Sequence, residues 1–177
     1  MNMIHTQFYQ TPVGELIIGA YKGQLCLCDW RYRRMRDQVD NRLQKYLGAG
    51  YEQQSDPLID QTIEQLDAYF SHQRQQFDLP LRLAGSDFQQ QVWQALIKIP
   101  YGSTYSYLQL SESLGNPKAI RAVASANGAN AISVIVPCHR IIGSDGSLTG
   151  YAGGLPAKEK LLKLEGADLP GRTLELF

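Results

Sequence analysis

The sequence predicts two domains, an α/β domain followed by a mostly helical one. Two strand-like runs, residues 16–21 and 24–30, are joined by Lys22-Gly23, a dipeptide typical of a tight hairpin. Residues 35–47 and 58–70 then carry spaced apolar side chains on a polar background, as amphipathic helices do. Helical patterns dominate the rest of the chain. These three observations indicate a sheet with helices first and a helical domain second.

The boundary between the two domains follows from the stretch FDLPLRLAGSD, which is extended, marked by proline and turn-like. We therefore predict domains over residues 1–84 and 85–177, with residues 48–56 as a surface loop within the first. The chain has 177 residues, enough for two small cores.

Composition narrows the class of protein. Apolar residues make up 44% and charged residues 19%, which is typical of a globular protein. Seventeen basic residues balance seventeen acidic ones, so net charge does not favour a polyanionic partner, although a local patch can still bind one. No apolar run is long enough to span a bilayer, and no secretion signal is visible. The three cysteines, an odd number, therefore indicate free thiols and a cytoplasmic location.

The second domain opens with a helix capped by Ser86 and stopped by Pro100-Tyr101-Gly102. A short helix over residues 106–114 ends at Gly115. Asn116 is then the expected cap of the next helix, with Pro117 at its first position. Two short helices joined by a glycine turn have the outline of a helix-turn-helix, which many proteins that bind no nucleic acid share.

The second helix of this pair, residues 117–127, has an unusual polar face. Ile120, Val123 and Ala124 fall at core spacing, and the opposite face is expected to carry Lys118, Arg121, Ala122, Ser125 and Ala126. A helix that reads base edges in the major groove usually presents several long polar side chains. This one presents one arginine among small residues, so contact with DNA would depend on shape; the alternative is an ordinary solvated helix.

The segment SVIVPCHRIIG places Cys138 between apolar runs that predict buried strand. A reactive thiol needs a base, and His139 is adjacent. Because neighbouring side chains on a strand point to opposite faces, a relay through one water is more plausible than direct contact. Glu165 lies in the last turn of a helix expected over residues 156–166, where the helix dipole disfavours an acid. A residue placed against a local rule is a candidate for function, and Glu165 could orient the imidazole. The alternatives are a buried structural cysteine, a solvated glutamate, and an Arg140 that pairs with a carboxylate.

Two longer segments carry a family resemblance. PCHRIIGSDGSLTGYAGGLPAKEKLLKLEG and YGSTYSYLQLSESLGNPKAIRAVASANGAN resemble the O6-alkylguanine-DNA alkyltransferases, the methylated-DNA–protein-cysteine methyltransferases of the bacterial Ogt type. The match runs from about residue 88 to residue 166. The first 84 residues are similar only in the TPVGEL strand start and the general layout.

The resemblance implies a fold and an activity. The first domain would have a ribonuclease-H-like α/β fold, and the second a winged-helix-like fold whose helix pair enters the minor groove. The protein would flip O6-alkylguanine out of double-stranded DNA and transfer the alkyl group irreversibly to a cysteine in one turnover. O4-alkylthymine is a further candidate lesion. A cytoplasmic monomer without cofactor is expected.

The resemblance also implies roles for individual residues. Cys138 would accept the alkyl group, with His139 and Glu165 as its proton relay. Asn130 would brace the turn beneath the cysteine. Tyr107 and Arg121 would hold the nucleotide and fill the gap in the stack. Backbone at Cys138, Ile141 and Ala152 would bind the guanine edge, and Tyr151 would wall the pocket.

Three departures from family patterns bear on these roles. Some members have serine where this chain has Ala152 and proline where it has Ser133, a change that could alter which alkyl groups fit. Some members bind zinc through amino-terminal Cys and His residues. Cys26 and Cys28 are expected on one face of a strand, with only His5 and His72 nearby in sequence, so no metal site is predicted.

Two rival hypotheses remain. A non-catalytic protein on the same scaffold could bind the lesion and mark it for another repair pathway. A cysteine hydrolase or acyltransferase unrelated to DNA would turn over an ester or amide and would not need Arg121.

Overall fold

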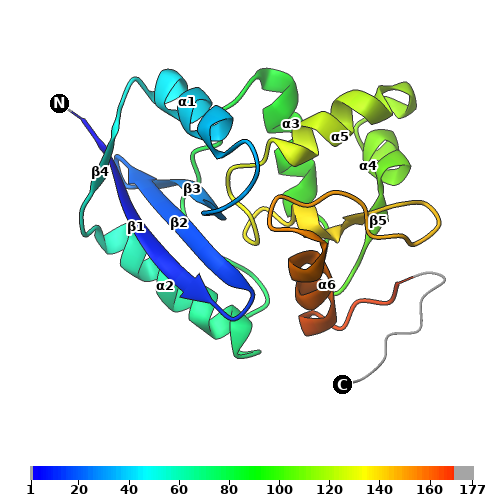
Figure 1. Ribbon diagram of the computed structural model, residues 1–177. Coiled ribbons are helices and arrows are strands. Elements are labelled where there is room, and N and C mark those ends of the chain that lie inside the picture. Colours follow the sequence, from blue (N-terminus) through cyan, green and yellow to red (C-terminus); the bar gives the residue numbers. More distant parts are fainter. Residues whose placement is uncertain (1, 170–177) are drawn as a thin grey trace.

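A four-stranded sheet forms the centre of the amino-terminal domain in the computed structural model, which describes residues 2–169 (Figure 1). Its strands are β1 (Ile4–Thr11), β2 (Gly14–Tyr21), β3 (Gln24–Trp30) and β4 (Tyr51–Gln53), in the order β3-β2-β1-β4. β1, β2 and β3 are antiparallel, and β4 pairs with β1 in parallel. The predicted hairpin is confirmed. The segment expected as a loop contains β4, a three-residue strand that depends on its pairing with β1.

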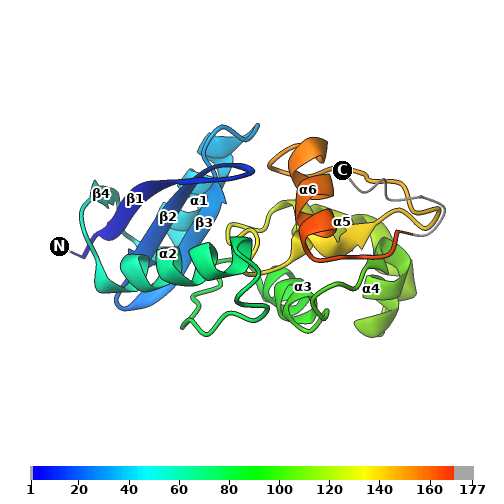
Figure 2. The same cartoon turned by 90° about the horizontal axis from the view of Figure 1, so that it is seen from below.

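Two helices cover opposite faces of this sheet (Figure 2). Helix α1 (Arg36–Leu47) packs Val39, Leu43 and Leu47 against one face. Helix α2 (Pro57–Phe70) packs its apolar side against the other and extends to the second domain. Its start is capped by Asp56, whose side chain accepts a hydrogen bond of 2.8 Å from the backbone N–H of Leu58. The two sequence-predicted helices are therefore confirmed.

A bulge in β3 changes the expected placement of its cysteines. The register shifts between Gly19 and Ala20, so Cys26 is the extra residue on β3. Cys26 consequently packs on the α1 side of the sheet and Cys28 on the α2 side. The expectation that both thiols share one face is wrong, because a bulge reverses the alternation of side chains beyond it.

As far as residue 169, the carboxy-terminal domain is built on four α-helices: α3 (Asp87–Ile97), α4 (Tyr107–Ser113), α5 (Ile120–Gly128) and α6 (Leu155–Leu164). Capping boxes start two of them: Ser86 pairs with Gln89 at α3, and Ser106 pairs with Gln109 at α4. No described helix is long and apolar enough to cross a membrane.

The start of the second helix of the pair differs from the prediction. Residues Pro117–Ala119 form a 3₁₀ turn before α5, and the Asn116 side chain makes no capping hydrogen bond. Val123 is buried as predicted, but Ile120 is 39% exposed and Ala126 is buried, the reverse of the prediction for these two residues. The reason is α3, which packs against α5 and whose Trp93 indole N–H donates to the carbonyl of Ala126 at 2.8 Å.

The cysteine segment is a turn and not the predicted strand. Val134 has φ of +70°, which breaks the extended run, and Ile132 forms only an isolated bridge to Cys28. Residues Cys138–Arg140 form a single 3₁₀ turn. The chain then enters β6 (Ile141–Ile142), which pairs in parallel with β5 (Tyr105–Ser106). Buried β-branched residues signal tight packing here but do not require a strand.

The two domains meet along the outer edge of β3. The linker covers one part of this edge, with backbone hydrogen bonds between Leu25 and the segment 80–82, and residues 131–133 cover the part around Cys28. The fully buried Asp29 lies at the same place. It accepts hydrogen bonds from the side chains of Arg33, Arg36 and Ser133, the last of these from the second domain.

Asp29→Ala should lower the free energy of unfolding by about 3 kcal/mol, because it leaves the largely buried Arg33 without a carboxylate and Arg36 with only Asp40. Urea denaturation measures this loss. Glu15→Ala is the matched control, since it breaks a more exposed pair with Arg31 and should cost at most about 1 kcal/mol. Equal losses in the two variants would contradict the structural role given to Asp29.

Candidate active site

The carboxylate of Glu165 gathers side chains from three parts of the chain. Glu165 directly follows α6, and its side chain is fully buried. His139 contacts it through Nε2 at 2.8 Å, and Arg140 binds both carboxylate oxygens at 2.8 and 3.0 Å. Tyr69, from α2 of the amino-terminal domain, donates its hydroxyl to Oε2 at 2.6 Å. The site thus joins the cysteine turn to the end of α6 and to the other domain.

These partners keep Glu165 ionised. Burial alone raises the pKa of a carboxyl group, but the hydrogen bond with His139 and the hydrogen bonds and charge of Arg140 outweigh it and hold the pKa of Glu165 well below its ordinary value. Arg140 is fixed in turn by the carbonyl of Ile99, to which it donates at 2.7 Å. The expectation that Arg140 pairs with a carboxylate is confirmed.

The hydrogen bond to Glu165 sets the tautomer of His139. Because the carboxylate can only accept, Nε2 of the imidazole carries the proton, and Nδ1 is left as the acceptor. Burial lowers the pKa of His139, so the ring is neutral near pH 7. Nδ1 is buried and has no hydrogen-bond partner among residues 2–169. The arrangement is a neutral base with one nitrogen open to receive a proton.

Cys138 begins the same turn and is 5% exposed. Burial raises the pKa of its thiol, and a hydrogen bond with Asn130 and the charge of Lys158 offset only part of that rise. The resting group is therefore a neutral thiol. Activation must come from removal of its proton during the reaction.

Asn130 fixes the segment that leads to the cysteine. Its amide donates to the carbonyls of Ile132 and Val136 at 3.3 and 2.9 Å, and its Oδ1 accepts from the N–H of Ile132 at 2.9 Å. The residues around the left-handed Val134 form no regular secondary structure, and these side-chain hydrogen bonds fix their backbone instead. The position of Cys138 is set by this bracing.

A cavity of about 510 Å³ is lined in part by Tyr151, whose ring contacts His139 of the turn. Of the sequence-predicted residues, Tyr107, Tyr151 and Ala152 line it, whereas Cys138, His139 and Ile141 are buried and do not. Arg121 lies outside, exposed on α5. The remaining wall comes from the end of α5, from residues 150–154, and from residues 32–35 of the amino-terminal domain, which sequence reasoning did not assign to the site.

Tyr151 connects the cavity to the buried turn. Its ring lies edge-on to His139, with centroids 6.5 Å apart, and edge-on to Trp30 of β3 at 6.0 Å. A Cβ atom on Gly153 would lie 2.7 Å from the Trp30 indole, so only glycine permits this approach. The amino-terminal domain thus supports the loop that walls the cavity.

Lys158 holds the other side of the same loop. Its fully buried ammonium donates to the carbonyls of Ile141 and Thr149, and burial lowers its pKa to about 8. The sequence did not indicate Lys158 or Tyr69 as site residues. Each falls on an amphipathic helix, where nothing in the pattern distinguishes a structural lysine or tyrosine from an ordinary one.

Comparison with known proteins agrees with this geometry. Residues 4–83 match the family model of the 6-O-methylguanine DNA methyltransferase ribonuclease-like domain. Residues 87–167 match the model of the 6-O-methylguanine DNA methyltransferase DNA binding domain. The expected fold class, a ribonuclease-H-like α/β domain followed by a helical domain, is therefore confirmed.

Relatives cover the whole chain. A methylated-DNA–protein-cysteine methyltransferase of Mycobacterium bovis is 41% identical over 178 residues, covering 99% of both chains. A constitutive one from Bacillus subtilis is 41% identical and covers 88% of this chain and 92% of its own. The crystal structure of the O6-methylguanine methyltransferase of Mycobacterium tuberculosis is 37% identical, with a TM-score of 0.79 over 96% of this chain and 97% of that one.

One of these solved structures has DNA bound. The Mycobacterium tuberculosis protein in complex with DNA is 38% identical, with a TM-score of 0.78 over 94% of this chain and 96% of that one. Full-length similarity at this level, together with the buried Cys-His-Glu arrangement, places the chain in the family of methylated-DNA–protein-cysteine methyltransferases.

Proposed function

We propose that this protein repairs DNA by direct reversal, transferring the alkyl group of O6-alkylguanine in double-stranded DNA to Cys138. The observation that carries the proposal is the neutral His139, held by the ionised Glu165 in the same buried turn as Cys138 and against Tyr151 of the cavity wall. Relatives named methylated-DNA–protein-cysteine methyltransferases support it. O4-alkylthymine remains a candidate second substrate.

The proton relay follows from the tautomer of His139. One water carries the thiol proton of Cys138 to the open Nδ1, while Glu165 stabilises the imidazolium that forms. The thiolate then attacks the alkyl carbon: the S–C bond forms as the C–O6 bond breaks, and the electron pair leaves with guanine. The proton held on His139 can then neutralise the departing base. The relay has to act at the moment of transfer, because burial keeps the resting thiol neutral.

The reaction ends after one transfer. Its product is a thioether, which has no electrophilic centre that water could attack, unlike an acyl-cysteine. The rigid packing around Cys138 suits a single well-aimed step. The protein is therefore consumed stoichiometrically.

The remaining sequence-predicted residues serve to present the base. The alkyl carbon is hidden inside a duplex, so the nucleotide must be flipped out, at a cost of a few kcal/mol. In our proposal Tyr107 contacts the flipped nucleotide at the cavity wall, and Arg121 enters the duplex from the exposed side of α5. Backbone at Ile141 and Ala152 holds the guanine edge, with Tyr151 as the wall.

The proposal extends to the organisation of the protein. We assign residues 1–84 to the supporting domain and residues 85–177 to the DNA-binding domain. The minor groove is the route of entry, since the helix pair presents small residues around Arg121. The protein would act as a monomer in the cytoplasm, where its three free thiols stay reduced.

Incubation with a duplex that carries one O6-methylguanine should add about one methylene to the intact mass of the protein, saturating at one per molecule. Cys138→Ala should show no gain. Lesion binding without a mass change in the wild-type protein would favour a damage-binding role instead. Clearance of excess substrate by a catalytic amount of protein would favour a hydrolase.

Tyr69→Phe should move the pH dependence of transfer, because it removes one hydrogen bond from Glu165. The carboxylate would then stabilise the imidazolium more strongly, so the pKa of His139 would rise. Since the neutral ring is the base, the acid limb of the rate profile should shift to higher pH, by up to about one unit. Loss of a hydrogen bond to a charged group should also cost about 1.5–3 kcal/mol of stability. Transfer rates from free O6-benzylguanine across pH measure the shift.

Tyr101→Phe is the matched control for this experiment. The Tyr101 hydroxyl donates to the carbonyl of Leu164 at 3.3 Å, directly beside Glu165, without contacting the carboxylate. Its profile should coincide with that of the wild-type protein. An unshifted profile in Tyr69→Phe would reduce Tyr69 to a packing role.

A further inference from the structure

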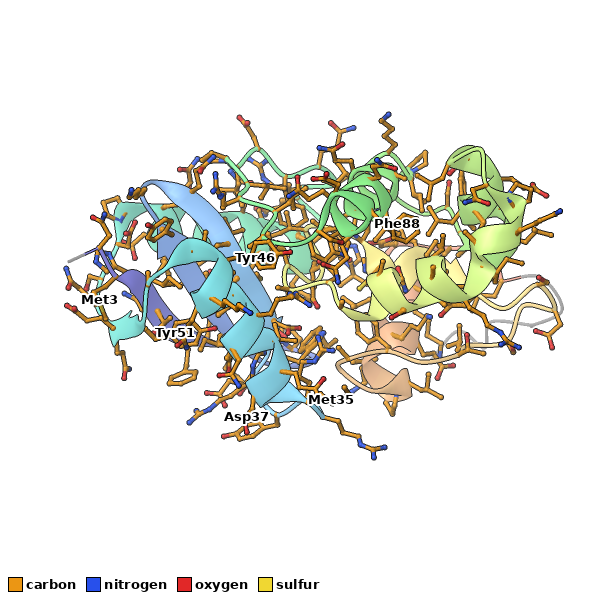
Figure 3. The ribbon with its side chains drawn as sticks, turned by 90° about the horizontal axis from the view of Figure 1, so that it is seen from above. Met3, Met35, Asp37, Tyr46, Tyr51 and Phe88 are labelled. Carbon is orange, nitrogen blue, oxygen red and sulfur yellow. The ribbon has the colours of Figure 1, made fainter. Side chains whose placement is uncertain are left out.

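The cavity wall includes a segment of the amino-terminal domain that the proposed function has not used. Residues 32–35, between β3 and α1, line the cavity together with the end of α5 and the loop 150–154. Tyr32 is 78% exposed and Met35 is 59% exposed, so this edge of the cavity is open at the surface. Figure 3 shows Met35 at the end of α1 nearest the carboxy-terminal domain.

This segment belongs to a run rich in arginine, and all but one of these arginines have partners. Arg31 pairs with Glu15 and stacks on Phe8. Arg33 and Arg36 both bind the buried Asp29. Arg34 is exposed, and its side chain has no hydrogen bond or ion pair with any residue of the described range 2–169. The guanidinium of Arg34 is therefore a cation at the cavity edge, and it stabilises no part of the described fold.

The neighbours of Arg34 fix it in place. Arg33 donates to the carbonyl of Gly128, at the end of α5, at 2.9 Å. Arg36 donates to the carbonyl of Trp30 at 3.1 Å. Met35 has φ of +65°, a left-handed conformation that a non-glycine residue adopts only when its surroundings impose it. The segment is thus held against the end of the DNA-facing helix and displays Arg34 outward.

Positive charge continues from this segment along α5. Lys118 and Arg121 are exposed at the start of that helix, and Gly128 at its end meets Arg33. Arg121 and Gly128 are seven residues apart, which corresponds to about 10 Å along the helix axis. No Asp or Glu lines the cavity between them. A duplex laid across α5 therefore reaches the 32–35 segment, and its phosphates meet cations at both ends of the helix.

We propose that residues 32–35 form a second DNA-contact surface at the cavity mouth, in which Arg34 binds a backbone phosphate. This inference rests on the proposed function, because it takes DNA as the partner. It gives the amino-terminal domain a direct part in substrate binding beyond its support of the active site. The contact is independent of sequence, since a phosphate carries no base information.

Binding to an undamaged duplex, measured by fluorescence anisotropy over a range of salt concentrations, tests the proposal. A single phosphate contact contributes about 0.9 to the slope of log affinity against log salt. Arg34→Gln should lose that contribution, so its affinity deficit relative to the wild-type protein should shrink by about threefold between 50 and 200 mM salt. Arg34→Lys keeps the charge and should keep the slope.

Arg82→Gln is the control, because Arg82 is exposed in the same domain but lines a separate cavity near Gln24 and Tyr46. It should bind like the wild-type protein. A wild-type slope in Arg34→Gln would overturn the inference, as would an equal loss of slope in Arg82→Gln. Alkyl transfer by the wild-type protein, measured on a lesion duplex in parallel, separates this result from the proposed function: if the wild-type protein transfers no alkyl group, the proposed function fails, whatever the slopes.

Discussion

The buried carboxylate of Glu165 is the interaction on which the rest of the structure depends. An ionised group without solvent contact is tolerated only when charges and hydrogen bonds surround it. Here His139, Arg140 and Tyr69 supply them, and they come from the cysteine turn and from α2. The same bonds orient the imidazole and hold α6 beside the cysteine turn. Removal of any partner leaves part of a buried charge uncompensated, so the chemistry and the packing cannot be separated.

This dependence gives the amino-terminal domain a role without any reacting group of its own. Tyr69 reaches the carboxylate from α2, and Trp30 supports the cavity loop through its contact with Gly153. Asp29 receives Ser133 from the segment that precedes Cys138. Three contacts from one domain therefore fix three parts of the site in the other. A protein that reacts once gains from such rigidity, because it needs one correct alignment and no opening for product release.

The sequence predicted the parts of this arrangement that local rules govern. Ser86 predicted the start of a helix, and Lys22-Gly23 predicted the turn of a hairpin. Glu165 was a candidate for function because an acid near the end of a helix opposes the helix dipole. The segment SVIVPCHRIIG pointed to Cys138 and His139, and the resemblance supplied their roles.

What the sequence could not predict depends on contacts between distant segments. Tyr69 is an ordinary apolar position on an amphipathic helix until α2 meets Glu165. The left-handed Val134 turns a strand-like run into a bend, which Asn130 stabilises by binding the backbone of Ile132 and Val136 on either side. The bulge at Cys26 reverses the faces of β3, and no glycine or proline within β3 itself signals it. In each case tertiary hydrogen bonding overrides the local pattern.

The central claim is that Cys138 rests as a neutral thiol and loses its proton only through the His139–Glu165 relay. Titration of the ultraviolet thiolate absorbance, taken as the difference between the wild-type protein and Cys138→Ala, tests it most directly. Burial raises the pKa of all three thiols, that of Cys26 to about 12, so the other two cysteines stay silent near neutrality. The account predicts no thiolate from Cys138 at pH 7 and a titration above pH 9, the ordinary value. A thiolate already present at pH 7 would contradict it and indicate a preformed thiolate–imidazolium pair.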